Sequence, residues 1–400
     1  MSLPKLPPLN LAGRLLRPIV QGGMGVGISA HRLAGTVAAN NAVGTIASVD
    51  LRRHHPDLMA HTTSIGCGAH AKAAINAANL EALNREIGAA RRIAAGAGLL
   101  AVNIMRAVAE YAAYVRQACA SGIDAIVVGA GLPLDLPELT ADHPKVALVP
   151  ILSDARGIAL ILKKWERKGR LPDAVVIEHP KHAGGHLGAA RIEDLGDPRF
   201  EFEQVLPEAR ALLRAHGAEQ LPLIPAGGIN TPQRVRQLFD LGASAVQVGT
   251  AFAVTEEGDA HPEFKRVLAE ARPEDIVEFV SVAGLPARAV RTPWLENYLR
   301  LLPRLQAKAA ARGPKKCTMV FDCLAQCGLR DGIARIGQFC IDHQLAAALR
   351  GDVMSGLFFR GDGRLPFGSQ IRPVRELIAY LLGEPAGGEE PHAEPALAVA

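Results

Sequence analysis

Several kinds of residue and segment are scarce in this chain of 400 residues, and each scarcity excludes a class of function. Aromatic residues make up only 4% of the sequence, the formal net charge is +4, and no basic run carries interleaved aromatics, so nucleic acid is not an expected partner. No apolar run reaches the roughly 18 residues of a membrane span. The N-terminal stretch MSLPKLPPLNLAG has one lysine and too many prolines for a signal peptide. We therefore expect a cytoplasmic protein that does not enter the membrane.

What the sequence does contain is one theme repeated eight times between residue 18 and about residue 254. A short apolar run ends in small or polar residues, and a segment of helical character follows. The runs are RPIVQGGMG, AVGTIASVD, LLAVNIMRA, AIVVGAGLP, VALVPILSD, AVVIEHPKH, LPLIPAGGI and AVQVGTAFA. Each is apolar on both faces, as buried parallel strands are. Eight such units predict an α/β fold of the TIM (β/α)₈ type, and the glycines of QGGMGVG have the wrong spacing for a doubly wound sheet.

The pattern changes after residue 254. We expect three parts: a barrel over residues 1–254, a mostly helical lobe over residues 255–380 beside the barrel mouth, and a disordered tail over residues 381–400. The tail is expected to be disordered because it is poor in large apolar residues. A lobe in this position can exclude water from a site at the strand ends.

Two glycine-containing loops follow the last two expected strands. PAGGIN places Gly227 and Gly228 after the seventh strand, and VQVGTAF places Gly249 and Thr250 after the eighth. In TIM barrels these two loops often hold a phosphate, because glycine lets backbone N–H groups approach it closely. Glycines that only make tight turns are the alternative, but their presence in both terminal units favours a phosphate site.

Other strand ends provide a place for a flat ring. In QGGMG, two adjacent glycines, Gly22 and Gly23, expose backbone at the barrel mouth. Asn103 ends the third strand and Gln247 lies within the eighth. Their amide groups suit hydrogen bonds to a heteroaromatic ring, although either amide can instead satisfy a neighbouring backbone group.

The segments PIVQGGMGVGIS, VNIM, AGGHLG, IPAGGIN and AVQVGTAF, in this order, resemble the nitronate monooxygenase family, formerly called 2-nitropropane dioxygenases, over about residues 15–300. The resemblance implies a TIM-barrel enzyme that uses FMN. It places the flavin ring against Gln21, Gly22, Gly23 and Met24, the ring or ribityl chain against Asn103, and the phosphate at Gly227, Gly228, Gly249 and Thr250. Gly185 and Gln247 complete the expected cofactor site.

The stretch IEHPKHAGGHLG, residues 177–188, contains three histidines. Two glycines, Gly184 and Gly185, separate His182 from His186 and would cost a metal-binding helix about 2 kcal/mol, and no H-E-x-x-H pattern is present. The glycines instead favour a bent loop at the barrel mouth. Because the family resemblance makes the histidine of AGGH catalytic, we expect His186 to remove a proton beside a nitro group or to hydrogen-bond nitro oxygens.

Four cysteines, Cys317, Cys323, Cys327 and Cys340, fall within 24 residues with the spacing C-x₅-C-x₃-C-x₁₂-C. The first gap is too wide for a zinc ribbon or finger. Four thiolates could hold a [4Fe–4S] cluster, whereas unliganded, buried cysteines, with Cys323 and Cys327 on one helix face, are the alternative. The sequence leaves both interpretations open.

These patterns predict FMN-dependent oxidation of alkyl nitronates or nitroalkanes by O₂, giving carbonyl compounds and nitrite. An FMN-dependent enoyl-thioester reductase that uses NAD(P)H is one alternative, because such enzymes share much of the motif set. A flavin-free barrel that binds a phosphate compound, as an isomerase or a binding protein, is another. The expected partners are a small-molecule substrate and O₂, and a homodimer is left open.

Overall fold

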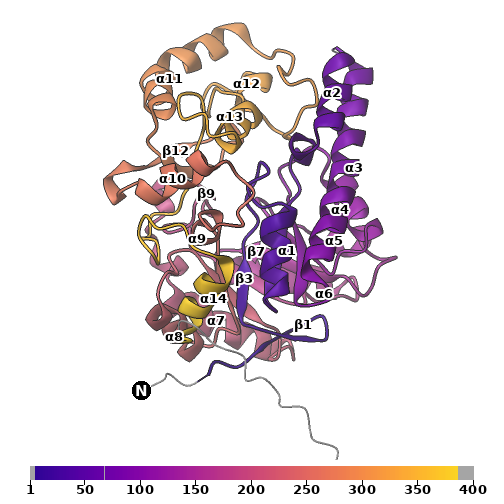
Figure 1. Cartoon of the computed structure of the whole chain (residues 1–400), viewed down its shortest axis with the longest axis vertical. Coiled ribbons are helices and arrows are strands. Elements are labelled where there is room, and N and C mark those ends of the chain that lie inside the picture. Colours follow the sequence, from indigo (N-terminus) through magenta and orange to yellow (C-terminus); the bar gives the residue numbers. More distant parts are fainter. Residues whose placement is uncertain (1–4, 67, 386–400) are drawn as a thin grey trace, which may run out of the picture.

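The computed structural model describes residues 5–66 and 68–385 of the chain (Figure 1). Eight parallel strands form a closed barrel in the order β10-β11-β3-β4-β5-β6-β7-β8. The strands are β3 (Ile19–Gln21), β4 (Val43–Ala47), β5 (Leu99–Met105), β6 (Ala125–Gly129), β7 (Ala147–Leu152), β8 (Val175–Glu178), β10 (Leu223–Ala226) and β11 (Val246–Val248). Each lies in one of the eight predicted runs, so the predicted TIM barrel is confirmed.

Successive side chains along each strand point alternately into and out of the barrel, and both sides are buried, which explains why the runs are apolar on both faces. Ala101 and Val127 point into the barrel and join one buried cluster, while their neighbours Val102 and Ile126 point outward into a second cluster beneath the helices. A hairpin of β1 (Leu9–Leu11) and β2 (Arg14–Leu16) precedes the barrel and adds Leu9, Leu11 and Leu16 to the inner cluster.

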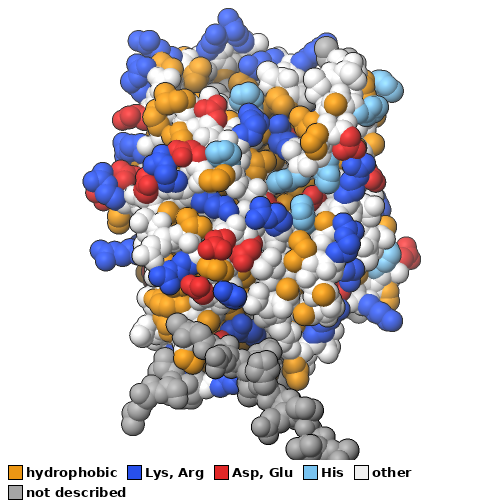
Figure 2. Space-filling model, viewed as in Figure 1, with side chains coloured by type: hydrophobic (Ala, Val, Ile, Leu, Met, Phe, Trp, Pro, Cys, Tyr) orange, Lys and Arg blue, Asp and Glu red, His pale blue; other side chains and the backbone are white. Residues whose placement is uncertain are grey.

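Helices surround the barrel (Figure 1). They are α1 (His31–Ala39), α2 (Pro56–Ser64), α3 (Ala69–Ala94), α4 (Tyr111–Ala120), α5 (Leu136–Leu139), α6 (Ala155–Glu166), α7 (Phe202–Ala215) and α8 (Pro232–Asp240). Some begin at side-chain caps: Asp154 accepts a 2.8 Å hydrogen bond from Gly157 N at the start of α6. Within the described residues, no helix is both long and apolar enough to cross a membrane. Figure 2 shows acidic and basic side chains interspersed over one face of the molecule.

The lobe that follows the barrel contains helices and a small sheet. Its helices are α10 (Pro262–Glu270), α11 (Pro293–Arg312), α12 (Gly328–Asp331) and α13 (Ile341–Leu349). Its antiparallel sheet has the order β12-β13-β9, with β12 (Ile276–Val280), β13 (Pro286–Val290) and β9 (Gly185–His186). Because β9 belongs to the histidine-rich loop of the barrel, this sheet joins that loop to the lobe.

The last helix, α14 (Val374–Leu382), extends past residue 380, where the lobe was expected to end. Leu377, Ile378 and Leu381 are buried in the outer barrel cluster, and α14 contacts α1 and α8. Figure 1 shows α14 beside α8, away from α11 and α13. The chain therefore returns to the barrel after the lobe, and α14 covers the gap between α8 and α1. Of the tail predicted to be disordered, residues 381–385 include the end of this helix, and residues 386–400 lie outside the described residues.

Candidate active site

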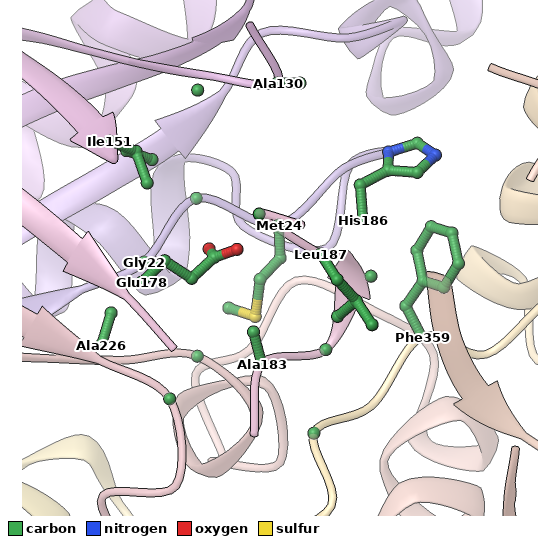
Figure 3. A pocket seen from close by; sticks show the side chains of 18 of the residues that line it. Gly22, Met24, Ala130, Ile151, Glu178, Ala183, His186, Leu187, Ala226 and Phe359 are labelled. Carbon is green, nitrogen blue, oxygen red and sulfur yellow. The ribbon is translucent and has the colours of Figure 1, made fainter. Parts of the chain in front are cut away.

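A cavity of about 620 Å³ lies where the C-terminal ends of the barrel strands face the lobe. Residues at or just beyond the ends of all eight barrel strands line one wall, and lobe residues such as Ile341, Leu345, Leu357 and Phe359 line the other. Figure 3 shows the strand ends and Phe359 on opposite sides of this space. Active sites of TIM barrels lie at this end, and the volume is in the usual range for a small-molecule site.

The cavity brings together eleven of the twelve residues expected at the cofactor and catalytic site: Gly22, Gly23, Met24, Asn103, Gly185, His186, Gly227, Gly228, Gln247, Gly249 and Thr250. Gln21 is the exception and corrects the expected contact with a ring. Its side chain is fully buried, its Nε2 donates to Thr45 O at 3.1 Å, and its Oε1 accepts from Thr45 N at 2.8 Å. Gln21 therefore ties β3 to β4 instead of facing the cavity.

The glycines of the barrel wall are required by close packing and by backbone conformation. A Cβ on Gly23 would lie 2.3 Å from the Cβ of Asn103, so Asn103 can occupy its place only beside a glycine. Gly227 and Gly228 have φ values of +103° and +71°, in a region of backbone conformation that residues other than glycine rarely adopt. The wall is thus formed largely by bare backbone.

The two amide side chains of this wall differ in their contacts. Asn103 Nδ2 donates to Val127 O at 3.5 Å, a distance at the outer limit of a hydrogen bond. Gln247 makes no side-chain hydrogen bond within the part of the chain that the structure describes, although only 8% of the residue is exposed. Because this amide faces the cavity, its hydrogen-bonding capacity is available to a ligand, and a ligand with ring nitrogen and oxygen atoms, such as a flavin, fits this wall.

The expected phosphate loops are covered by a segment of the lobe, residues 359–366, which we call the strap. Thr250 Oγ1 accepts a hydrogen bond from Gly361 N at 3.1 Å, and Asn230 Nδ2 donates to Arg364 O at 2.8 Å. A Cβ on Gly184 would lie 2.5 Å from Gly361 N, so the strap also packs tightly on the histidine-rich loop. The sequence analysis missed the strap because no local signal links it to loops more than 100 residues earlier.

His186 lies on β9 at the edge of the cavity, beside Phe359, with 5.6 Å between the ring centroids (Figure 3). Its Nε2 is 3.0 Å from Ser281 Oγ. Ser281 Oγ also accepts a hydrogen bond from Ala283 N, and since a hydroxyl can both donate and accept, the contact fits either tautomer of the neutral ring; with Ser281 donating to Nε2, the ring proton is on Nδ1. Burial lowers the pKa of His186 to about 4, so the ring is neutral at physiological pH.

The other two histidines of the loop have separate partners. His182 Nδ1 lies 2.8 Å from Asp362 Oδ2 on the strap. His179 is buried and lies 3.2 Å from Glu201; burial lowers its pKa, against the opposing effect of Glu201. Among residues 5–66 and 68–385, no three His, Cys, Asp or Glu side chains are arranged to hold a metal ion. The rings of His179 and His182 lie against each other, with 4.6 Å between their centroids, whereas His186 has its contacts with Ser281 and Phe359.

The cysteine-rich segment gives no support for an iron–sulfur cluster. Cys317, Cys323, Cys327 and Cys340 are free thiols, and among the described residues no three metal-ligating side chains are arranged to hold a metal ion. The expected helix through Cys323 and Cys327 is not formed, because α12 begins only at Gly328. Cys323 lines the cavity, where burial raises its pKa well above the ordinary value, so it is a neutral thiol.

The structure also adds two carboxylates that the sequence analysis missed. Glu178, the last residue of β8, lines the cavity, and burial raises its pKa to about 7 against the opposing charge of Arg288. Asp342 of α13 lines the opposite wall and pairs with Arg53 at 2.5 Å. Glu178 was missed because a single carboxylate after an apolar run forms no recognisable motif. Asp342 was missed because its partner, Arg53, is 289 residues away in the sequence.

Comparison with known proteins identifies the family. The family model described as nitronate monooxygenase matches residues 12–384. The chain therefore belongs to the nitronate monooxygenase family, which confirms the resemblance found in the sequence.

Individual relatives match a shorter region. A probable nitronate monooxygenase of Bacillus subtilis is 31% identical over 123 residues, which are 31% of this chain and 33% of that protein. A nitronate monooxygenase of Pseudomonas aeruginosa is 36% identical over 118 residues, 30% of this chain and 31% of that protein. The chain thus matches only about a third of the length of these relatives.

Solved structures share the fold over most of the chain. FabK from Thermotoga maritima superposes with a TM-score of 0.62 at 21% identity, covering 92% of this chain and 91% of that one. Nitroalkane oxidase from Streptomyces ansochromogenes gives a TM-score of 0.61 at 19% identity, with 92% and 95% covered. At these identities the likeness establishes the fold, including the lobe, and leaves the reaction to be proposed.

Proposed function

We propose that this chain is an FMN-dependent enzyme that oxidises alkyl nitronates or nitroalkanes with O₂, giving a carbonyl compound and nitrite. Family membership supports this proposal. The observation that carries it is the conjunction, in one cavity, of the AGGH histidine, the two glycine loops and the amide-bearing wall. Bound FMN would supply a ring that accepts electrons from the substrate and passes them to O₂.

The barrel wall would hold the cofactor. Gly227, Gly228, Gly249 and Thr250 line the end of the cavity beneath the strap, where exposed backbone N–H groups suit a phosphate. Gly22, Gly23 and Met24 would lie along the ring, with the amides of Asn103 and Gln247 as its hydrogen-bonding groups. The unpartnered amide of Gln247 is the observation that supports this assignment.

In this proposal His186 is a hydrogen-bond donor to the substrate. A ring whose pKa is about 4 is a weak base at physiological pH, and its Nε2 is occupied by Ser281. The remaining N–H can bind an oxygen of the negatively charged nitronate. Of the two roles expected for this histidine, hydrogen bonding to nitro oxygens is therefore the better supported.

The lobe would exclude water and receive the carbon chain of the substrate. Leu324, Ile341, Leu345 and Leu357 present an apolar surface to the cavity. An acyl chain would also fit this surface, which supports FMN-dependent enoyl reduction as a second candidate, and FabK, a structural neighbour, shares the fold. Preference for the first candidate rests on the family match.

One experiment separates the candidates. Purified protein is first examined for a flavin spectrum, because a colourless protein that does not bind added FMN would point to a flavin-free barrel. The FMN-loaded protein is then mixed without oxygen with ethyl nitronate, with NADH or with NADPH. Rapid bleaching of the flavin by the nitronate, followed by nitrite release when O₂ is admitted, supports the proposal. Bleaching by a nicotinamide alone supports enoyl reduction.

A further inference from the structure

Glu178 is a carboxylate inside the cavity to which the proposed reaction assigns no role. It is the last residue of β8, where it pairs in register with Ala226 of β10. Figure 3 shows its carboxylate pointing into the cavity toward Met24, with Gly22 close by. These two neighbours belong to the stretch that is expected to lie along the flavin ring, so Glu178 faces the same place.

Glu178 differs from the other cavity carboxylates because it has no partner. Asp154 caps α6 through a 2.8 Å hydrogen bond, and Asp342 pairs with Arg53. Within the described residues, the carboxylate of Glu178 accepts no hydrogen bond and forms no ion pair. Its position at the floor of the cavity leaves a bound ligand as the group to which it can hydrogen-bond.

Among the described residues, Arg288 of β13 is the charged side chain whose field acts appreciably on Glu178. The guanidinium of Arg288 donates hydrogen bonds to Pro180 O, Ala183 O and Glu278. The other titratable or cationic groups that line the cavity are Asp154 and Arg199 beside the barrel, His182 and His186 on the loop, and Cys323, Asp342 and Arg364 on the lobe.

We propose that the carboxyl group of Glu178 hydrogen-bonds to the ring of bound FMN and sets how readily that ring accepts electrons. This rests on the FMN part of the proposed function. The residue is neither oxidised nor reduced: below its pKa it keeps its proton when the ring is reduced, and above its pKa the ionised carboxylate takes up one proton from solvent as the ring is reduced. A protonated carboxyl donates a hydrogen bond to a ring oxygen or nitrogen, which favours added electron density, whereas an ionised carboxylate repels it.

The protonation state of Glu178 makes this effect dependent on pH. Burial raises its pKa to about 7, so the carboxyl is mostly protonated below that pH and ionised above it. A carboxylate beside the ring disfavours electron uptake. The midpoint potential of the bound flavin should therefore fall more steeply with pH above about 7 than below it.

The test measures the midpoint potential of bound FMN from pH 5.5 to 8.5 by reductive titration against redox dyes. For the wild type, the plot of midpoint potential against pH should bend near pH 7, where its slope becomes steeper. Glu178→Gln keeps a hydrogen-bond donor but cannot ionise, so its profile should lack the bend and lie above that of the wild type at pH 8.5. Glu208→Gln removes an exposed carboxylate on α7 and should follow the wild type. The FMN dissociation constants of both variants should stay within about threefold of the wild-type value.

The outcomes distinguish this inference from the proposed function. If the wild-type protein does not bind FMN, the flavin-dependent function fails. If it binds FMN but its profile is unbent, or if the Glu178→Gln profile parallels it at every pH, the role of Glu178 is overturned and the function stands. If Glu178→Gln does not bind FMN, the Glu178→Asp variant is measured in its place. A change of slope in its plot of midpoint potential against pH, at a pH different from that of the wild type, supports the role of Glu178. A plot without a change of slope overturns it.

Discussion

The two walls of the cavity are built by different means. The barrel wall consists of glycine backbone and two amide side chains at strand ends, held in place by a closed barrel. The lobe wall consists largely of apolar side chains, and hydrogen-bonded side chains hold it in place: Arg53 donates to Asp342, and His182 contacts Asp362. The comparison indicates that the barrel wall determines what is bound, whereas the lobe wall determines how firmly the cavity is closed.

The largest effect is expected on the lobe side, at Asp342. Burial raises its pKa to about 7, with the charge of Asp50 adding to the rise and Arg53 opposing it. In the unfolded chain such a carboxyl titrates near pH 4, so its contribution to stability is fully present below about pH 4 and is lost as the pH rises to about 7. Between pH 5 and pH 8 the loss should be roughly 3 kcal/mol.

Asp342→Asn cannot ionise, so this part of the pH dependence should disappear. Urea unfolding at pH 5 and pH 8 measures it, and Asp142→Asn, which alters an exposed carboxylate, is the matched control. If the Asp342→Asn variant and the wild type lost the same free energy of unfolding between the two pH values, the assignment of the titration to Asp342 would be wrong.

The next effect is expected on the barrel wall, at Gly23. Gly23→Ala places a Cβ 2.3 Å from that of Asn103, so Asn103 must move away from the expected ring. Overpacking of this kind costs about 1–3 kcal/mol, and we expect the dissociation constant for FMN to rise by roughly 10- to 100-fold. Fluorescence titration of the apoprotein with FMN measures it. Gly25→Ala, whose Cβ would lie 3.8 Å from that of Val49, is the control, and equal affinities in the two variants would contradict this account.

A smaller effect is expected where the two walls meet, at His186. His186→Asn removes the proposed hydrogen bond to the nitronate, worth about 1.5–3 kcal/mol, so flavin reduction by ethyl nitronate should slow by about 10- to 100-fold. Because burial lowers the pKa of His186 to about 4, the ratio of wild-type to variant rate constants should stay constant from pH 5.5 to 8. A ratio that rises through pH 6.5 would show that His186 acts as a base instead. His143→Asn, in an exposed loop, is the control.

The smallest effect is expected at the strap. The His182 and Asp362 side chains are 33% and 36% exposed, and a contact of this exposure contributes no more than about 1 kcal/mol. Asp362→Asn should therefore speed FMN release by about two- to fivefold. Stopped-flow fluorescence of FMN release measures it. An unchanged release rate would mean that this contact does not hold the strap.

The difference between the barrel wall and the lobe wall also explains what the sequence could and could not predict. The barrel follows from local patterns, because each strand is a short apolar run with a helix after it, and strand ends of a barrel must converge. The convergence of the strand ends was enough to place three glycines at the same mouth of the barrel: Gly22, Gly227 and Gly249. Gln21 could not, because a strand of three residues does not reveal which side chain faces the cavity and which bridges to the next strand.

The lobe depends on contacts that are distant in sequence. The pairing of β13 with β9 joins segments about 100 residues apart, and the strap meets Thr250 across 111 residues. No periodicity marks such contacts. The residues of α14 were expected to end the lobe, and only the packing of this helix against α1 and α8 shows that it belongs to the barrel.

The central claim is that the cavity between these walls holds FMN and passes electrons to it from a nitronate. The most direct measurement mixes FMN-loaded protein with ethyl nitronate under anaerobic conditions, follows the flavin absorbance, and assays nitrite after O₂ is admitted. We predict flavin reduction by the nitronate, well above any reduction by NADH or NADPH, followed by nitrite release. Reduction by a nicotinamide with none by the nitronate would contradict the claim.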